Sequence, residues 1–399
     1  MSSTALLERN LVVYGRYRIA SHLLFWLPTS VLFLSARTDL GTALWLWAAY
    51  FLSVVAAEVP SGWFSDRVSR VATLRLGAVA WIVAACLLLA AGSSVPVLMA
   101  GQVFLALGFA FRSGTDQALH YDTLEALDRA EEFERREARA GRNAFVGTMA
   151  AALAGGLLGV VDLRLPYLAW LAAAIAQLVA TRRLTEPPRH VDDPPITLSS
   201  SQLRSALGSL RDPTLAWIFV FMVVQQPLEG LALDLMQPWL TLVTGTTFDE
   251  PGTAPLVSGG LMAVVSIVGA AAVAVSPRLR AAIGTRSTLV LLSAVEAAIL
   301  IGMATVVSPW LLVLLALRST QTAAAPVVVA TATAPRLARS VRATFLSLGS
   351  LGGRLANGVT LVWLGRLDDI DDVLDAGAAI GVVCLVVLIA SGALLRATD

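Results

Sequence analysis

Hydrophobic stretches of about twenty residues recur along the whole chain and alternate with short segments that carry most of the charged residues. A helix of that length crosses the roughly 30 Å hydrocarbon core of a bilayer. Because backbone groups in lipid must be satisfied within the protein, runs this long and apolar favour helices over strands. The pattern predicts twelve spans, at residues 12–35, 43–64, 74–92, 96–119, 142–161, 165–182, 214–242, 256–276, 287–306, 309–331, 343–363 and 373–395.

The composition supports a membrane protein and excludes several other classes. Hydrophobic residues make up 57% of the chain, charged residues make up 14%, and the mean hydropathy is +0.74. A soluble protein would need an implausibly large core to bury so many apolar side chains. Cys86 and Cys384 fall inside predicted spans and the histidines lack metal-ligand spacing, so we expect neither a disulfide nor a bound metal. No phosphate-binding loop or nucleophile motif is present, so we expect no cofactor, no enzymatic activity and no nucleic-acid partner.

Arginine supplies every positive side-chain charge apart from histidine, and its distribution predicts the topology. The chain has 29 arginines and no lysine. When both termini are placed on the same side, the termini and loops of that side hold 21 arginines and the opposite loops hold 3. Arginine-rich loops of membrane proteins stay in the cytoplasm. The sequence therefore predicts a multi-pass protein of the cytoplasmic membrane with its N- and C-termini in the cytoplasm.

A polar segment at residues 183–213 divides the predicted spans into two sets of six. We expect an N-terminal six-helix bundle at 1–183, a cytoplasmic linker at 184–213 and a C-terminal six-helix bundle at 214–399. The linker also predicts a short surface helix that begins near Ser200. Glycines recur in the fifth and the eleventh spans, and small residues let helices approach closely. The predicted fold is an all-α membrane protein with two pseudo-symmetric halves.

The segment between the second and third predicted spans reads EVPSGWFSDRVSR and contains Gly62, Asp66, Arg67 and Arg70. This spacing resembles the loop 2–3 signature of the major facilitator superfamily, Gly-x-x-x-Asp-Arg/Lys-x-Gly-Arg. Ser69 stands where that signature has its second glycine. The preceding EVPSG resembles the Glu-x-Pro-Thr-Gly lead found in one bacterial branch of the superfamily. The layout of six plus six spans extends the resemblance over the whole chain.

The resemblance implies a cytoplasmic gate at this turn. In the superfamily the charged turn helps to hold the two halves together when the transporter is open to the outside. Asp122, at the inner end of the fourth predicted span, is well placed to pair with Arg70. The alternative is a solvated turn that obeys the positive-inside rule, which explains the arginines but not Gly62 and Asp66 at this spacing.

Further charges lie deeper in the second and fourth spans, where a charge is costly unless it is paired or hydrated. Glu58 precedes Asp66 by eight residues, which is about 12 Å along a helix. By the same measure, Arg112 and Asp116 lie about 15 and 9 Å above Asp122. We therefore expect Glu58 to pair with Arg112, either as a structural ion pair or as part of a proton pathway.

Polar residues also interrupt the spans of the second half. Pro227 in the seventh span frees backbone groups, which usually happens beside a cavity. The resemblance implies that spans 1, 4, 7 and 10 line the cavity and that span 9 is peripheral, so we expect Glu296 to support the fold or to pair with Arg354. The residues that we expect on the proton or substrate pathway are Glu58, Arg112, Asp116, Gln225, Gln226, Glu229, Asp234, Arg318, Gln321 and Arg354.

Two other charged segments are expected to reach water. Arg16 and Arg18 lie near the start of the first span, where long side chains can snorkel to the membrane surface; a substrate role is the alternative. Residues 122–142 mix acidic residues and arginines at helical spacings and predict a solvated surface helix with i,i+4 pairs.

Together these features predict a monomeric secondary active transporter that works by alternating access in the lipid bilayer. Acidic residues abound in the predicted core and no sodium-site pattern is evident, so we expect proton coupling with Glu229 as carrier and Asp116 in reserve. The expected activity is export of small amphiphilic or cationic compounds. The chain lacks the proline of the superfamily's antiporter signature in span 5, and Thr115 stands where drug antiporters have glutamine. Uptake of an anionic metabolite bound by the buried arginines, and a non-transporting sensor or scaffold, are the alternatives.

Overall fold

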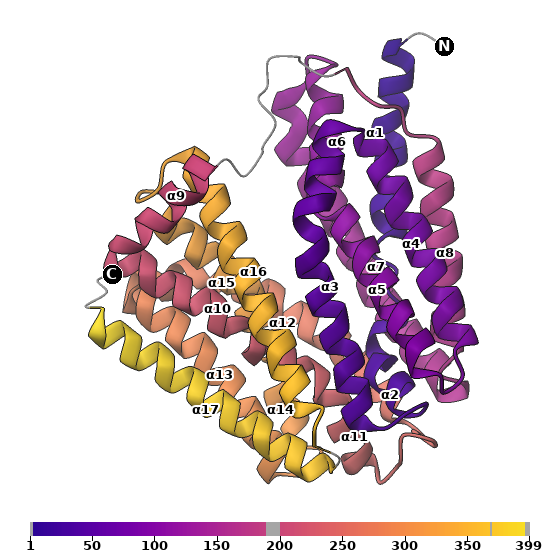
Figure 1. Cartoon of the computed structure of the whole chain (residues 1–399), viewed down its shortest axis with the longest axis vertical. Coiled ribbons are helices and arrows are strands. Elements are labelled where there is room, and N and C mark those ends of the chain that lie inside the picture. Colours follow the sequence, from indigo (N-terminus) through magenta and orange to yellow (C-terminus); the bar gives the residue numbers. More distant parts are fainter. Residues whose placement is uncertain (1–2, 189–199, 368, 396–399) are drawn as a thin grey trace. The chain divides into compact units, whose positions relative to one another are not determined.

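The computed structural model describes residues 3–188, 200–367 and 369–395, and these residues are almost entirely helical (Figure 1). The contacts divide the chain into two compact units. The first unit comprises residues 1–33 and 49–197, and the second comprises residues 34–48 and 198–399. The segment 34–48 thus packs with the C-terminal unit, although it precedes most of the first unit in the sequence.

Helices of the first unit begin at local sequence signals. Ser69 caps α4 because its hydroxyl oxygen accepts a hydrogen bond from the N–H of Ala72 at 3.0 Å. Proline occupies the first turn of α5 and of α8, where a missing N–H does no harm. The elements are α1 (Ser3–Ala20), η1 (Leu27–Thr29), α2 (Ser30–Ser35), α3 (Leu40–Arg67), α4 (Arg70–Ala90), α5 (Val95–Arg112), α6 (Thr115–Glu125), η2 (Ala130–Glu132), α7 (Phe133–Val161) and α8 (Leu165–Arg182). Of these, α2 ends in the segment 34–48 and α3 begins there.

The second unit shows similar signals. Asp212 caps α10 by accepting a hydrogen bond from the N–H of Thr214 at 2.8 Å. The short surface helix predicted near Ser200 is present as α9 and packs against α16. The elements are α9 (Ser200–Gly208), η3 (Ser209–Arg211), α10 (Pro213–Asp234), α11 (Met236–Thr244), α12 (Ala254–Ile283), α13 (Thr285–Thr305), α14 (Leu311–Leu315), α15 (Ser319–Thr333), α16 (Arg339–Leu364) and α17 (Ile370–Leu394).

Ten helical segments in the described part of the chain are long and apolar enough to cross a membrane. They coincide with the expected spans other than 12–35 and 343–363. Those two correspond to α1 with its continuation and to α16, whose arginines make them less apolar. The chain is an integral multi-pass membrane protein, and a total of twelve spans stays a prediction.

Four of the expected spans contain an interruption of the helix that the apolar pattern does not indicate. The first span leaves helix after Ala20 and resumes in η1, and the fourth breaks at Ser113 and Gly114. Gly114 has φ +73°, a conformation that favours glycine. The hydrogen-bonding pattern of the seventh span is interrupted at Leu235 and that of the tenth between α14 and α15, but Leu235, Ala316 and Arg318 keep right-handed helical φ and ψ. Non-helical backbone at membrane depth occurs where it is buried in protein or lines a cavity, and the first and fourth spans are two of those expected around the cavity.

Glycine permits a matching close contact in each unit. A Cβ atom at Gly155 in α7 would collide with the carbonyl oxygen of Phe25, in the break of the first span. A Cβ atom at Gly353 in α16 would lie 2.7 Å from the carbonyl oxygen of Met222 in α10. The glycines of spans 5 and 11 therefore let those spans approach spans 1 and 7, respectively.

Candidate functional site

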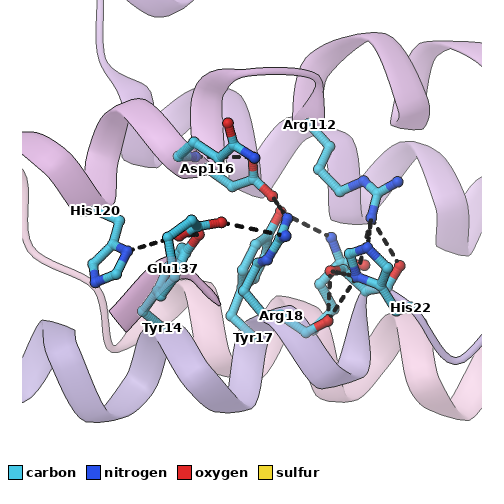
Figure 2. A network of polar contacts seen from close by, with 11 residues as sticks. Tyr14, Tyr17, Arg18, His22, Arg112, Asp116, His120 and Glu137 are labelled. Atoms are coloured by element: carbon cyan, nitrogen blue, oxygen red, sulfur yellow. Dashed lines mark hydrogen bonds and ion pairs between the residues drawn. The ribbon is translucent and has the colours of Figure 1, made fainter. Parts of the chain in front are cut away.

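A buried ionic network joins three helices of the first unit (Figure 2). Arg18 of α1 places Nη1 2.6 Å from Oδ2 of Asp116 in α6 and Nη2 3.4 Å from Oε1 of Glu137 in α7. The exposed fractions of these side chains are 12% for Arg18, 5% for Asp116 and 16% for Glu137. We call these three residues, together with Tyr14 and His120, the Arg18 network.

Tyr14 and His120 complete the hydrogen bonding of Glu137. The Tyr14 hydroxyl donates to Oε2 of Glu137 at 2.8 Å, and Nδ1 of His120 lies 2.9 Å from the same oxygen. The two rings stack with their centroids 4.1 Å apart. Buried charges are stable only when they are paired and hydrogen-bonded. The network meets this condition by placing one guanidinium group between two carboxylates, as Figure 2 shows.

Arg112 stands at the break of the fourth span and stabilises the break of the first. Its Nη1 donates to the carbonyl oxygen of Ser21 at 3.1 Å and lies 3.4 Å from Nδ1 of His22. Its guanidinium group also lies over the rings of Trp81 and Phe109, 5.3 and 5.2 Å from their centroids. An unsatisfied carbonyl group at membrane depth is costly. Arg112 therefore supplies a hydrogen bond that the interrupted helix lacks.

The network corrects two sequence-based expectations. Arg18 does not snorkel, because two largely buried carboxylates hold its guanidinium group inside the unit. Glu137 lies in the segment expected to be solvated, yet it belongs to the network. The same segment is not one surface helix, because α6 ends at Glu125 and α7 begins at Phe133, but the expected i,i+4 pairing is present between Glu132 and Arg136.

The expected pairing of the second and fourth spans has a different outcome for each acid. The sequence places Asp116 one turn from Arg112, whereas the ion pair that the structure shows for Asp116 is with Arg18. Glu58 is half-buried on α3, and its carbonyl oxygen accepts a hydrogen bond from the Ser61 hydroxyl at 3.0 Å. A Glu58–Arg112 ion pair stays a prediction.

The turn with the superfamily-like signature is held from two sides. Arg70 forms the predicted ion pair with Asp122 of α6. Glu186, which follows α8, accepts hydrogen bonds from Oγ of Ser69 at 2.6 Å and from the N–H groups of Arg70 and Val71, both at 2.9 Å. Free N–H groups at a helix start favour a carboxylate. Sequence reasoning missed Glu186, because local patterns do not reveal a cap more than 100 residues away.

The neighbours of Glu186 fix the same segment to the first unit. Asn10 donates to the carbonyl oxygen of Thr185 at 2.7 Å and accepts from its N–H at 2.9 Å. Arg75 donates to the carbonyl oxygen of Leu184 at 3.4 Å. Residues 184–186, which we expect to begin the linker, therefore belong to the first unit by their contacts.

The other signature residues lie at the end of α3. Gly62 is exposed, and none of the atoms described around it would lie within 4 Å of a Cβ atom there. Asp66 is half-buried and Arg67 is exposed. Beside them, an apolar groove of about 900 Å³ is lined by side chains of α3, α4 and α5, including Trp63 and Phe111. This part of the first unit thus combines a charged turn with an apolar surface.

The second unit holds three acids around one arginine. Glu229 of α10 is half-buried, interacts by hydrogen bonds with Thr322 and Gln225, and has Arg318 as its charged neighbour. Arg318 is also the charged neighbour of Asp234, at the end of α10. Arg318 lies where the tenth span breaks. It acts on Glu296 of α13 as well, so Glu296 joins this group, and a pair with Arg354 stays a prediction.

Several polar atoms of this group lack hydrogen-bond partners among the described residues. They include Oδ2 of Asp234, both carboxyl oxygens of Glu296, Nε of Arg318 and Oε1 of Gln321. Gln321 donates through Nε2 to the Ser293 hydroxyl at 3.0 Å. We call Glu229, Asp234, Glu296, Arg318 and Gln321 the Arg318 group.

Gln226, an expected pathway residue, lies at the interface of α10 and α16. Gln226 lies against Gly353, where a Cβ atom would come within 2.5 Å of its side chain. Arg354 follows on α16 and is half-buried. The structure thus brings Glu229, Asp234, Arg318 and Gln321 together, whereas Gln226 contributes to helix packing.

The chemistry that these groups allow is ion binding and proton exchange. Carboxyl groups that are largely buried and incompletely paired change their charge state when a neighbouring charge changes. In the first unit the acids are compensated by Arg18, whereas in the second unit three acids share Arg318.

Comparisons with known proteins agree with this architecture. The family model described as Major Facilitator Superfamily matches residues 18–361. No curated protein matches the sequence.

Solved structures of transporters share the fold at low sequence identity. The nucleoside transporter NupG is 12% identical, with a TM-score of 0.74 over 97% of this chain and 98% of that one. The POT family transporter PepTSo is 11% identical, with a TM-score of 0.71 over 100% of both chains. A bacterial homologue of the iron transporter ferroportin, in an inward-facing state, is 16% identical, with a TM-score of 0.65 over 98% of this chain and 99% of that one. At these identities the likeness shows the fold alone.

Proposed function

The chain belongs to the Major Facilitator Superfamily, and on that premise we propose that it is a secondary active transporter of a small molecule. It works by alternating access in the cytoplasmic membrane, with twelve spans in two six-helix halves, cytoplasmic termini and a monomeric state. It exports small amphiphilic or cationic compounds in exchange for protons. The signature around Gly62 and Asp66 serves as its cytoplasmic gate.

The observation that carries this proposal is the position of buried charges at the helix breaks. Arg112 and Asp116 flank the break of the fourth span, and Asp234 and Arg318 lie where the hydrogen-bonding pattern of the seventh and tenth helices is interrupted. Transporters of this kind bind ions and substrates where spans are interrupted. A sensor or scaffold has no need to keep costly charges at these places.

Proton coupling is supported by the charge balance of the Arg318 group. Three carboxyl groups share one guanidinium group, so at most one of them is compensated. Binding of protons or of a cationic substrate relieves this imbalance. Glu229 is the proposed carrier, because it lies two residues after Pro227 and is more exposed than the other two acids.

The proposed substrate class follows from two features. The excess of acids in the Arg318 group favours a cation. The apolar groove beside the signature offers a surface for the apolar part of an amphiphile. One observation favours the alternative, an anionic substrate: Nε of Arg318 lacks a hydrogen-bond partner among the described residues.

The test is a screen with the purified protein in proteoliposomes that contain a trapped pH-sensitive dye. Small organic cations such as ethidium and tetraphenylphosphonium are added one at a time, with organic anions as the second set. An exporter that exchanges cations for protons produces a change of internal pH with at least one cation. Responses to anions alone support the alternative, and no response to any compound would support a sensor or scaffold.

A further inference from the structure

Glu296 is a buried acid for which the fold offers no obvious use. It lies in α13, and its residue is 0% exposed. Neither carboxyl oxygen has a hydrogen-bond partner among the described residues. The resemblance to the superfamily places this span outside the ring that lines the cavity, so a role in contacting substrate does not explain the residue.

The helices that pack on α13 are α10, α12, α14, α15 and α17, and the charged groups that act on Glu296 come from two of these places. From the break before α15, Arg318 acts on it as an opposite charge, and from α10, Glu229 acts on it as a like charge. On the side of α17 the contact is apolar, since Ala297 and Leu300 lie against Gly381. Of the helices in contact with α13, α10 and the segment at α15 therefore supply the charges that act on Glu296.

The charged form of Glu296 is poorly supported in this place. A buried carboxylate needs hydrogen-bond donors as well as an opposite charge, and without them burial favours the neutral acid. Arg318 is also shared with Glu229 and Asp234. The ionised form therefore lacks the donors and the undivided counter-charge that it needs, whereas the protonated form needs no counter-charge and costs less to bury.

We propose that Glu296 is a proton-binding site, coupled to Glu229 through their common neighbour Arg318. Binding forms one O–H bond on the carboxylate of Glu296 and takes one proton from water, and release reverses this step. When Glu229 loses its proton, Arg318 compensates it and Glu296 keeps its own proton. The proposal deepens the proposed proton coupling, on which it rests for its role in transport, but proton binding by Glu296 requires no substrate.

The test is infrared difference spectroscopy of the protein reconstituted in lipid, with buffers of stepped pH and no substrate. We expect wild type to show at neutral pH the C=O band of the protonated Glu296 carboxyl group, and Glu296→Gln to lack it. The control is Glu250→Gln, which replaces an exposed acid in a loop and should leave the band unchanged. Glu229→Gln keeps the band but changes the pH range over which it disappears. The same band in wild type and Glu296→Gln overturns the site, and an unchanged pH range in Glu229→Gln overturns the coupling.

Stability measurements keep the test decisive if spectra are weak. Glutamine has the shape of a neutral glutamic acid, so Glu296→Gln keeps the thermal unfolding temperature of wild type if Glu296 is protonated. A clear loss of stability in Glu296→Gln, with Glu250→Gln as control, means that Glu296 is ionised and overturns the proposal.

Loss of the wild-type infrared band on adding Na⁺ at constant pH also overturns it, because the ligand is then a metal ion. If the band behaves as expected but no compound moves protons, the proposed transport fails and the site stands.

Discussion

Replacing Arg18 tests whether the buried network of the first unit holds its helices together. The change Arg18→Gln removes the guanidinium group that lies 2.6 Å from Asp116 and 3.4 Å from Glu137. Two unit charges about 4 Å apart interact by about 4 kcal/mol at an effective dielectric constant of about 20. Breaking a buried ion pair by removing one partner costs about 3–5 kcal/mol, since the other charge stays buried. We therefore expect a loss of about 3–5 kcal/mol, which is on the order of 10 °C in Tm for a unit of this size.

The assay is thermal unfolding of the purified protein in detergent, followed by tryptophan fluorescence. Arg16→Gln is the matched control, because Arg16 lies on the same helix two residues earlier and is exposed. The double change Arg18→Gln with Asp116→Asn removes a charge of each sign, so it should be more stable than Arg18→Gln alone. Equal Tm values for Arg18→Gln and Arg16→Gln, or strictly additive losses in the double variant, refute this view of the network.

Three further predictions follow from the contacts. Gly155→Ala forces a Cβ atom onto a backbone carbonyl group and should lower stability by about 1–3 kcal/mol in thermal unfolding, whereas Gly141→Ala in the same helix meets open space and should not. Asp66→Asn should leave folding and membrane insertion intact but impair transport in proteoliposomes, and wild-type rates would contradict a gating role. Glu186→Gln weakens the cap of α4 and should cost about 1 kcal/mol of stability, so an unchanged Tm would show that the cap contributes nothing.

The sequence predicts most of the membrane-spanning helices, because apolar runs of sufficient length have few alternatives in lipid. It does not predict the breaks equally well. Gly114 and Pro28 are local signals for two of them, but no glycine or proline marks the break at Arg318. Arg318 keeps helical φ and ψ, so the interruption there is a local change of hydrogen bonding, which a linear pattern does not contain.

The partner of a buried charge could be predicted only where the sequence fixes both the depth of the two residues in the membrane and the sides of the helices on which they lie. Arg70 and Asp122 lie at the ends of adjacent helices, and their pairing was predicted correctly. Depth alone did not identify Arg18 as the partner of Asp116, because it says nothing about which side of a helix a residue occupies. The burial of Glu137 was missed for a related reason. An acidic residue in a charged, helical segment is predicted to be solvated unless its spatial neighbours are known.

The central claim, proton-coupled transport with Glu229 as the proton carrier, is tested most directly by Glu229→Gln in proteoliposomes loaded with a compound that the screen identifies. Two rates are measured for wild type, Glu229→Gln and the control Glu250→Gln: transport driven by a pH gradient, and exchange of labelled for unlabelled compound without a gradient. The account predicts that Glu229→Gln loses the first and keeps the second, because binding and alternating access do not need its proton. If Glu229→Gln still moves the compound against its gradient as wild type does, Glu229 is not the proton carrier and the account is contradicted.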